Sequence, residues 1–453
     1  MNRRVGGLFL AVGLVLGACS TDAGVRSTGA DSAAMADAEL TPDPATRMFT
    51  LDNGLAVYVR ENNRPGGSAE LRLVVNAGSS LEEPDQSGVA HFLEHMLFNG
   101  TEAYPHNELI EVLRGFGMEF GADVNAYTSY DETVYELTVP VDDSGNLGSG
   151  LDVLAEWLSK AAIGEDEVIA ERGVVLDEWR TRDQTLYGRQ GQVLEEMFLS
   201  GSGYEGRDPI GTDAAIEAMT VEPLRRFYDT WYRPDNAAVV VVGDIDVDEV
   251  EQLVRERFEG ITARAGDDTR PDLAFDPFVE AVARVAPDPD ATEAMAELTW
   301  PHPGEPATTA TEIRSRLLVQ LGFDMIATRL DDDISGGDAA FTDAVVSSNN
   351  SVRMIDAPSV YVSAEAADGT AAIDALVVEF ERARRYGFDE NEVARAIDYY
   401  RSAIDADHES RDTRSDSGFA GSAGSDVRTG SPIRAAGGEC AGDAGVPGAS
   451  TTE

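Results

Sequence analysis

The five-residue stretch His91-Phe92-Leu93-Glu94-His95 is the most informative part of this sequence. On a helix, residues four apart lie on one face about one turn from each other, so the two imidazoles point the same way. Two neutral imidazole nitrogens at this spacing can bind one Zn²⁺ ion. Glu94 lies beside them and can act on a water near the ion without being a ligand. The order H-x-x-E-H, the reverse of the H-E-x-x-H zinc motif, therefore predicts a metal site with its own general base.

A third metal ligand is expected on a second helix. The segment 164–180 is predicted to begin a long helix, and Glu171 and Glu178, seven residues apart, share one of its faces. One carboxylate can complete a His₂Glu site, while the other can accept a hydrogen bond from a ligating imidazole. Spacing alone does not decide between Glu171 and Glu178. A solvated acidic helix face is the alternative explanation.

Three sequence blocks together resemble a known family. The resemblance is to the M16 peptidases, the group that includes pitrilysin, insulin-degrading enzyme and mitochondrial processing peptidase. It covers roughly residues 46–415 and is strongest between 88 and 180. The blocks are HFLEHMLFNGT (His91 to Thr101), NAYTSYDETVY (Asn125 to Tyr135) and ERGVVLDE (Glu171 to Glu178).

The resemblance implies a role for each residue of the predicted metal site. Glu178 matches the family's third zinc ligand, after His91 and His95, and Glu171 matches the carboxylate that supports the site from outside. Glu94 matches the general base. The expected cofactor is one Zn²⁺ per chain, although a His₂Glu site also accepts Mn²⁺ or Co²⁺. The expected activity is hydrolysis of peptides or unfolded polypeptides.

The block that begins at Asn125 is predicted to form a β-strand. Apolar and polar residues alternate from Val124 to Asp131, with β-branched and aromatic side chains among them. An ordinary hairpin strand would explain this pattern by itself. The resemblance adds that the strand is an open sheet edge that pairs with the substrate backbone. Asn125 and Ala126 are therefore the expected substrate-binding residues.

The first 19 residues are predicted to be a lipoprotein signal peptide. Arg3 and Arg4 precede an apolar stretch, 8–16, that is too short to span a bilayer as a helix. The stretch ends in Leu-Gly-Ala-Cys, so Cys19 resembles the lipidated cysteine of bacterial lipoproteins. A plain secretory signal is the alternative. Lipid attachment would place the protein in the bacterial cell envelope, at the periplasmic face of the outer membrane.

The chain is strongly acidic, with a formal net charge of −48. Lys160 is its only lysine. Nucleic-acid binding requires a positive surface, so we expect no nucleic-acid partner. The only other cysteine, Cys440, lies far from Cys19, and we expect no structural disulfide in the folded part.

The fold class expected from the pattern and the resemblance is α+β. Two similar domains are predicted, each with a mainly antiparallel sheet packed by helices. After the signal peptide (1–19), the expected segments are a flexible tether (20–45), the catalytic domain (46–262), a linker (263–290), a second, incomplete domain (291–421) and a disordered tail (422–453).

The composition of the tail affects the expected partners. After Gly421 the sequence is rich in Gly, Ala and Ser, and it looks truncated beside the family. In the family, an Arg and a Tyr from an opposite half or partner subunit face the zinc, and neither can be placed in this chain. We therefore expect a homodimer or a partner M16-like half. His106 and His302 are predicted to lie outside the site. A non-catalytic binding or assembly subunit, an inactive fragment and a hydrolase of another substrate class are the alternatives.

Overall fold

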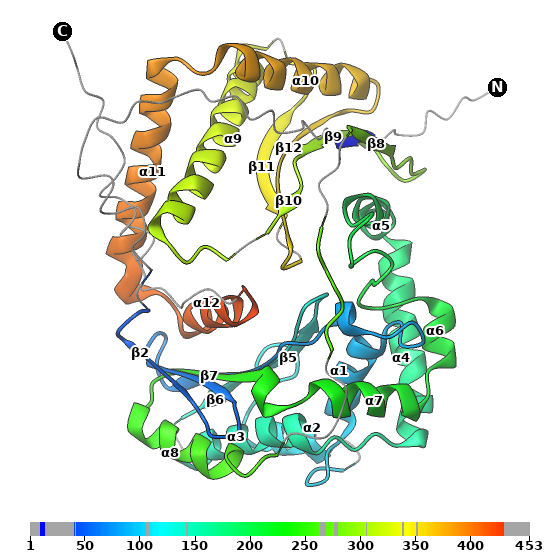
Figure 1. Ribbon diagram of the computed structural model, residues 1–453, viewed down its shortest axis with the longest axis vertical. Helices are drawn as coiled ribbons and strands as arrows, with labels where there is room; N and C mark the ends of the chain where they lie inside the picture. Colours follow the sequence, from blue (N-terminus) through cyan, green and yellow to red (C-terminus); the bar gives the residue numbers. More distant parts are fainter. Residues whose placement is uncertain are drawn as a thin grey trace.

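The computed structural model describes residues 10–13, 40, 42–105, 108–141, 144–262, 269–275, 280–304, 306–337, 339–349 and 352–429. These residues form two sheets, each covered by helices, one above the other in Figure 1. The predicted α+β class with two mainly antiparallel sheets is confirmed, although each sheet also contains one parallel pair. Cys19, His106, Cys440 and residues 430–453 lie outside the described residues.

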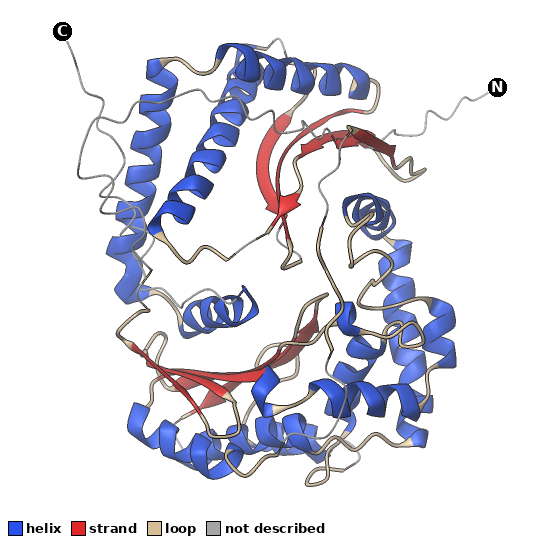
Figure 2. Ribbon diagram, viewed as in Figure 1, coloured by secondary structure: helices blue, strands red, loops and turns tan. Residues whose placement is uncertain are grey.

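The first sheet has the strand order β2-β3-β7-β4-β6-β5. All seven residues of β7 are buried at the centre of the sheet. Helices cover one face, as Figure 2 shows. The strands are β2 (Thr46–Thr50), β3 (Ala56–Glu61), β4 (Ser68–Val75), β5 (Val124–Thr128), β6 (Thr133–Pro140) and β7 (Ala237–Gly243). The helices are α1 (Val89–Asn99), α2 (Glu108–Gly115), α3 (Ser144–Ser159), α4 (Glu165–Gln184), α5 (Leu186–Phe198), α6 (Asp213–Ala218), α7 (Val221–Trp231) and α8 (Val247–Phe258).

The first helix, α1, is anchored by a carboxylate from an earlier turn. Its N-cap, Gly88, has φ +78°, and a Cβ there would lie 2.7 Å from the backbone oxygen of Ile210. Glycine is therefore required, and it offers no side chain to cap the helix. Glu82 supplies the missing acceptor, because its two carboxylate oxygens accept hydrogen bonds from Gly88 N at 3.0 Å and Ala90 N at 2.9 Å.

The protonation of Glu82 is expected to make stability depend on pH. Burial raises the pKa of Glu82 to about 8, although both backbone donors and Arg207 favour its ionised form. A raised folded-state pKa stabilises the fold below the ordinary value of 4.5, and this contribution is lost as the pH rises toward 8. We expect Glu82→Gln to be less stable than the parent at pH 5. The difference in the free energy of unfolding between parent and variant should decrease by roughly 1.4 kcal/mol per pH unit between about pH 5 and pH 8.

Urea unfolding of parent and Glu82→Gln across this pH range measures that gap. The exposed Glu83→Gln is the neighbouring control, and it should follow the parent at every pH. A constant gap between the Glu82 variant and the parent would contradict the assignment of a raised pKa to this carboxyl group.

The second sheet contains the path β10-β12-β9-β1-β8, with β11 also paired to β12. Its apolar core lies between these strands and two helices, α9 and α10. The strands are β1 (Leu10–Gly13), β8 (Val282–Val285), β9 (Glu293–Thr299), β10 (His302–Pro303), β11 (Asp343–Asn349) and β12 (Ile355–Glu365). The helices are α9 (Ala310–Gly336), α10 (Gly369–Tyr386), α11 (Glu390–Ser410) and α12 (Asp416–Thr429).

Three expected segments differ from the structure. Residues 10–13, expected to lie within the signal peptide, form strand β1, which pairs with β8 and β9. The linker expected over 263–290 contains strand β8, which pairs with β1. The tail expected from 422 begins inside helix α12, which lies between the two sheets in Figure 1. This helix is ordered because Phe419, Ala420 and Ala423 are buried against β4, β6 and β7 of the first sheet. Small residues that we expected to leave the chain unfolded allow the helix to approach the sheet closely.

Polar contacts also join the two domains near strand β5. Asp131, in the turn after β5, accepts hydrogen bonds from Tyr204 Oη at 2.9 Å and from Arg353 N at 2.6 Å. The Arg353 side chain donates to Asn76 at 2.5 Å.

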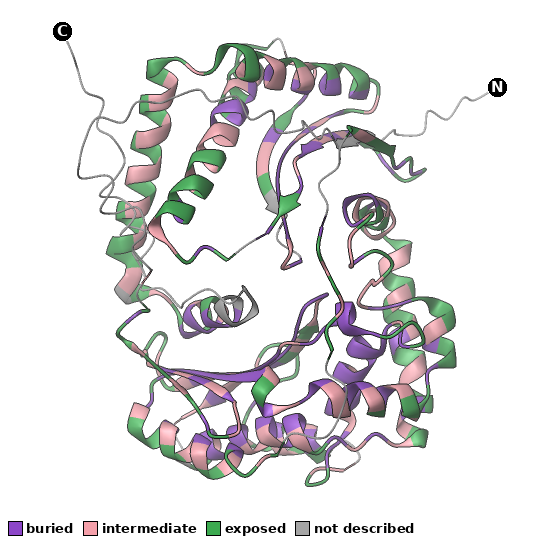
Figure 3. Cartoon of the chain, in the orientation of Figure 1, coloured by how far each residue is buried: buried purple, intermediate pink, exposed green. Residues whose placement is uncertain are grey.

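Figure 3 shows buried residues concentrated around the first sheet and its helices, including α1. Among the described helices, none is long and apolar enough to cross a bilayer.

Candidate metal centre

Two helices bring the predicted site residues together. Helix α1 presents His91, Glu94 and His95, and helix α4 presents Glu171 and Glu178. The imidazoles lie edge to face, with ring centroids 4.8 Å apart, as one helical turn predicts. α1 is mostly buried, whereas the Glu178 side chain is 50% exposed. The cluster is therefore fixed on a buried helix and open to solvent on the α4 side.

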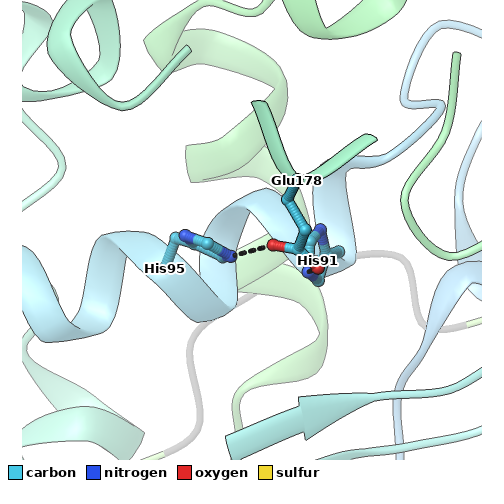
Figure 4. A group of neighbouring side chains, drawn as sticks. All are labelled: His91, His95 and Glu178. Carbon is cyan, nitrogen blue, oxygen red and sulfur yellow. Dashed lines mark ion pairs between the residues drawn. The ribbon is translucent and has the colours of Figure 1, made fainter. Parts of the chain in front are cut away.

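The geometry of His91, His95 and Glu178 fits one divalent ion. Their ligand atoms all lie within 4.8 Å of one another. Glu178 Oε1 is 3.4 Å from His91 Nε2, and Glu178 Oε2 is 3.3 Å from His95 Nε2 (Figure 4). Two ligands of a tetrahedral Zn²⁺, each about 2.0–2.1 Å from the ion, are roughly 3.4 Å apart. The two His–Glu distances thus match the spacing that a His₂Glu zinc site requires.

Glu171 orients the second imidazole from behind. Its Oε1 is 2.9 Å from His95 Nδ1, and its Oε2 accepts a hydrogen bond from Asn99 Nδ2 at 2.7 Å. A carboxylate at Nδ1 keeps the proton on that nitrogen, which leaves Nε2 free to bind a metal. His91 differs, because its Nδ1 is buried and forms no hydrogen bond with the part of the chain that the structure describes.

The charges in the cluster are mutually stabilising. Burial disfavours a charged imidazole, but hydrogen bonds to Glu171 and Glu178 outweigh it and raise the pKa of His95 to about 10. Hydrogen bonds from His91 and His95 hold the pKa of Glu178 well below its usual range. Burial opposes ionisation of Glu171, yet hydrogen bonds from His95 and Asn99 lower its pKa. Both carboxylates are therefore ionised at neutral pH, as metal ligation requires, whereas the His95 imidazole would have to release its Nε2 proton when a metal binds.

Glu171→Gln is expected to weaken metal binding without removing a ligand. The substitution preserves the shape of the side chain but removes the charge that fixes the His95 tautomer, so affinity should fall by roughly 10–100-fold. Competition with a chromogenic chelator measures this change. Glu165→Gln, at the exposed start of the same helix, is the matched control and should bind the ion as the parent does. Equal affinities for Glu171→Gln and the parent would contradict the orienting role.

Glu94 lies between the helix and the edge of the sheet. It is 8% exposed, and its Oε2 accepts a hydrogen bond from Thr128 Oγ1 at 2.7 Å. Burial raises the pKa of Glu94, although His91, Thr128 and His95 favour the ionised form. A buried carboxylate with a raised pKa, beside a metal cluster but outside its ligand set, has the properties of a general base.

Strand β5 is an edge strand among the described strands of the first sheet, since it pairs with β6 alone. Hydrogen bonds at the two ends of this hairpin, Ser129 N to Glu132 O and Thr138 N to Asp123 O, fix which residues face β6. By antiparallel alternation, the backbone groups of Val124, Ala126 and Thr128 face away from it. The Ala126 N–H on this open side donates to the Asn125 side chain at 3.0 Å.

The structure thus gathers the five predicted residues of the metal site and places β5 next to them. His302 lies elsewhere, on the exposed strand β10. Two contributing residues, Asn99 and Thr128, were not predicted as site residues. Both lie inside the quoted blocks, and their spacing from Glu171 and Glu94 along the chain gives no indication of contact. Only the packing of α1 against α4 and β5 creates these hydrogen bonds.

Comparison with known proteins gives the family. Residues 57–203 match the family described as insulinase (peptidase family M16), and residues 218–400 match the peptidase M16 inactive domain. The probable zinc protease PqqL of Haemophilus influenzae is 40% identical over 214 residues, 47% of this chain and 23% of that protein. Its Escherichia coli counterpart is 39% identical over 220 residues, 49% of this chain and 24% of that protein.

A solved structure extends the similarity to both domains. The crystal structure of the first half of the periplasmic protease PqqL from Escherichia coli superposes with a TM-score of 0.80 at 27% identity. It covers 88% of this chain and 85% of that one. By sequence, the matched segment spans less than a quarter of either PqqL relative. The two family matches, the shared fold and the His-x-x-Glu-His cluster together show that this chain belongs to the M16 (insulinase) family of zinc metallopeptidases.

Proposed function

We propose that this chain is the zinc-binding half of a metalloendopeptidase that hydrolyses peptides or unfolded polypeptides. The observation that carries the proposal is the convergence of His91 Nε2 and His95 Nε2 on the Glu178 carboxylate. Those three residues would hold one Zn²⁺ per chain. Glu94, next to the cluster but outside it, would be the catalytic base.

The chemistry requires both the ion and the base. A Zn²⁺ ion held by these residues would lower the pKa of water and polarise the scissile carbonyl. Glu94 accepts a proton from the attacking water through its free oxygen and returns it to the leaving amine. The C–N bond breaks, one product takes the hydroxyl as a carboxylic acid, and the other takes the proton as an amine; ionisation at neutral pH then gives a carboxylate and an ammonium group. Glu171 would keep His95 in the tautomer that binds the ion.

Substrate binding would use the open side of β5. An extended peptide can pair with the backbone of Ala126 and Thr128 as an additional strand, and the Asn125 side chain would exchange its bond to Ala126 N for one with the peptide. This mode favours unfolded segments, because a folded loop cannot pair along an edge.

The location and partner of the protein are also proposals. PqqL of E. coli is named as periplasmic, and a signal peptide with Cys19 as the lipidated residue would anchor this chain in the same compartment. Cleavage before Cys19 would remove strand β1 from the second sheet. The similarity to the first half of PqqL supports a second M16-like half, or a second copy of the chain, as the partner that completes the substrate chamber.

Cleavage of an unstructured fluorogenic peptide tests the proposed activity. We expect hydrolysis that a chelator abolishes and stoichiometric Zn²⁺ restores. Specific activity should rise with protein concentration if two copies form the chamber. The folded form of a small protein is the substrate control and should resist cleavage. Peptide binding with no cleavage at any concentration would favour the non-catalytic alternative.

A further inference from the structure

Thr128 joins two parts of the site that the sequence treats separately. It is the last residue of β5, and its hydroxyl donates to Glu94 Oε2 at 2.7 Å. This is the only hydrogen bond from a side chain to the Glu94 carboxylate among the described residues. Because Glu94 is 8% exposed, water cannot readily replace the contact.

The pairing of β5 with β6 determines where the hydroxyl and the backbone groups of Thr128 point. Side chains alternate along β5, and Val124 and Ala126, which share a face with Thr128, pack into the core beneath the helices. The hydroxyl therefore faces α1. The backbone groups of Thr128 lie at the open edge, because the hydrogen-bonded pairs on either side of it are Tyr127–Val134 and Ser129–Glu132. One residue thus contacts both Glu94 and the edge.

We infer that Thr128 is a positioning residue that holds the Glu94 carboxylate in its productive orientation and couples that orientation to a peptide bound along β5. The inference rests on the proposed function. With Oε2 hydrogen-bonded to Thr128, the other oxygen of Glu94 is left for proton transfer. A base must lie within hydrogen-bonding distance of the proton that it takes, and a displacement of about 1 Å can lower the rate by roughly 100-fold.

A purely structural role for Thr128 makes a different prediction. A hydroxyl that only satisfies a buried carboxylate would change stability when removed, and would leave the turnover of correctly folded protein unchanged. The distinction therefore lies in kcat, in KM and in the effect of restoring the hydroxyl on a smaller side chain.

The kinetic test compares Thr128→Val, which removes the hydroxyl at constant shape, with Thr128→Ser, which keeps it. We expect Thr128→Val to lower kcat by about 10–100-fold, with KM and zinc content within twofold of the parent. Thr128→Ser should have a kcat close to that of the parent. Thr138→Val is the matched control, because it removes a Thr–Glu hydrogen bond of 3.0 Å to Glu70 in the same sheet. It should leave kcat unchanged.

A thermal-denaturation cycle on the metal-free protein gives a readout that does not require activity. Thr128→Val should lower the melting temperature, and should lower it less in a Glu94→Ala background, where no carboxylate loses its donor. Unchanged kcat in Thr128→Val, a Ser variant as impaired as Val, or additive melting shifts would overturn the inference. If the parent cleaves no peptide, the proposed function fails and the cycle alone decides whether Thr128 and Glu94 are coupled.

Discussion

Glu94→Gln is expected to abolish peptide hydrolysis while leaving the metal site intact. The amide has the same shape and can still accept a hydrogen bond from Thr128, but it cannot take a proton from water. Removal of a general base typically lowers rates by roughly 10²–10⁴-fold. Because Glu94 lies outside the cluster of His91, His95 and Glu178, zinc content should match that of the parent.

The measurement pairs turnover of an unstructured peptide with zinc quantified by atomic absorption on the same preparation. Glu102→Gln, at an exposed carboxylate just after α1, is the control and should turn over like the parent. An inactive Glu94→Gln that has also lost zinc would show that Glu94 supports the ligands. A fully active variant would require a different base.

Much of the metal site could be predicted from sequence because its residues obey helical spacing. His91 and His95 are one turn apart on α1, and Glu171 and Glu178 are two turns apart on α4, so local periodicity alone places each pair on a face. The sequence could not decide which carboxylate faces Nδ1 and which faces Nε2. Which carboxylate lies at each nitrogen depends on how α4 packs across α1, and the spacing of residues along the chain does not reveal this packing.

The fold shows the same division between local and tertiary information. Local chemistry accounts for the start of α8, where the Asp246 side chain caps the helix by accepting hydrogen bonds from Asp248 N and Glu249 N. The long helix predicted to begin in the segment 164–180 ends at Gln184, and the Thr185 side chain then caps α5 by accepting a hydrogen bond from Gly188 N. Helix α12 was missed because its Gly- and Ala-rich sequence has little apolar surface, and it is ordered by contact with the first sheet.

Removal of the Glu178 carboxylate, which lies close to both imidazoles, should weaken metal binding more than replacement of Glu171. Glu178 lies 3.4 Å and 3.3 Å from the two imidazole Nε2 atoms, whereas Glu171 contacts only the Nδ1 side of His95. Glu178→Ala leaves only two protein ligands, one fewer than the three that a zinc site of this kind uses. The loss of affinity should therefore exceed the roughly 10–100-fold expected for Glu171→Gln.

Thermal stability with and without zinc gives a direct measurement of this loss. An ion that binds only the folded state stabilises the parent by about 2.7 kcal/mol when its concentration is 100 times the Kd. Glu178→Ala should show no such increase at the same zinc concentration, and Asp177→Ala, at the exposed neighbouring carboxylate, should show the full increase. If zinc stabilised Glu178→Ala as much as the parent, the ion would have to bind elsewhere. The assignment of Glu178 as a ligand would then be wrong.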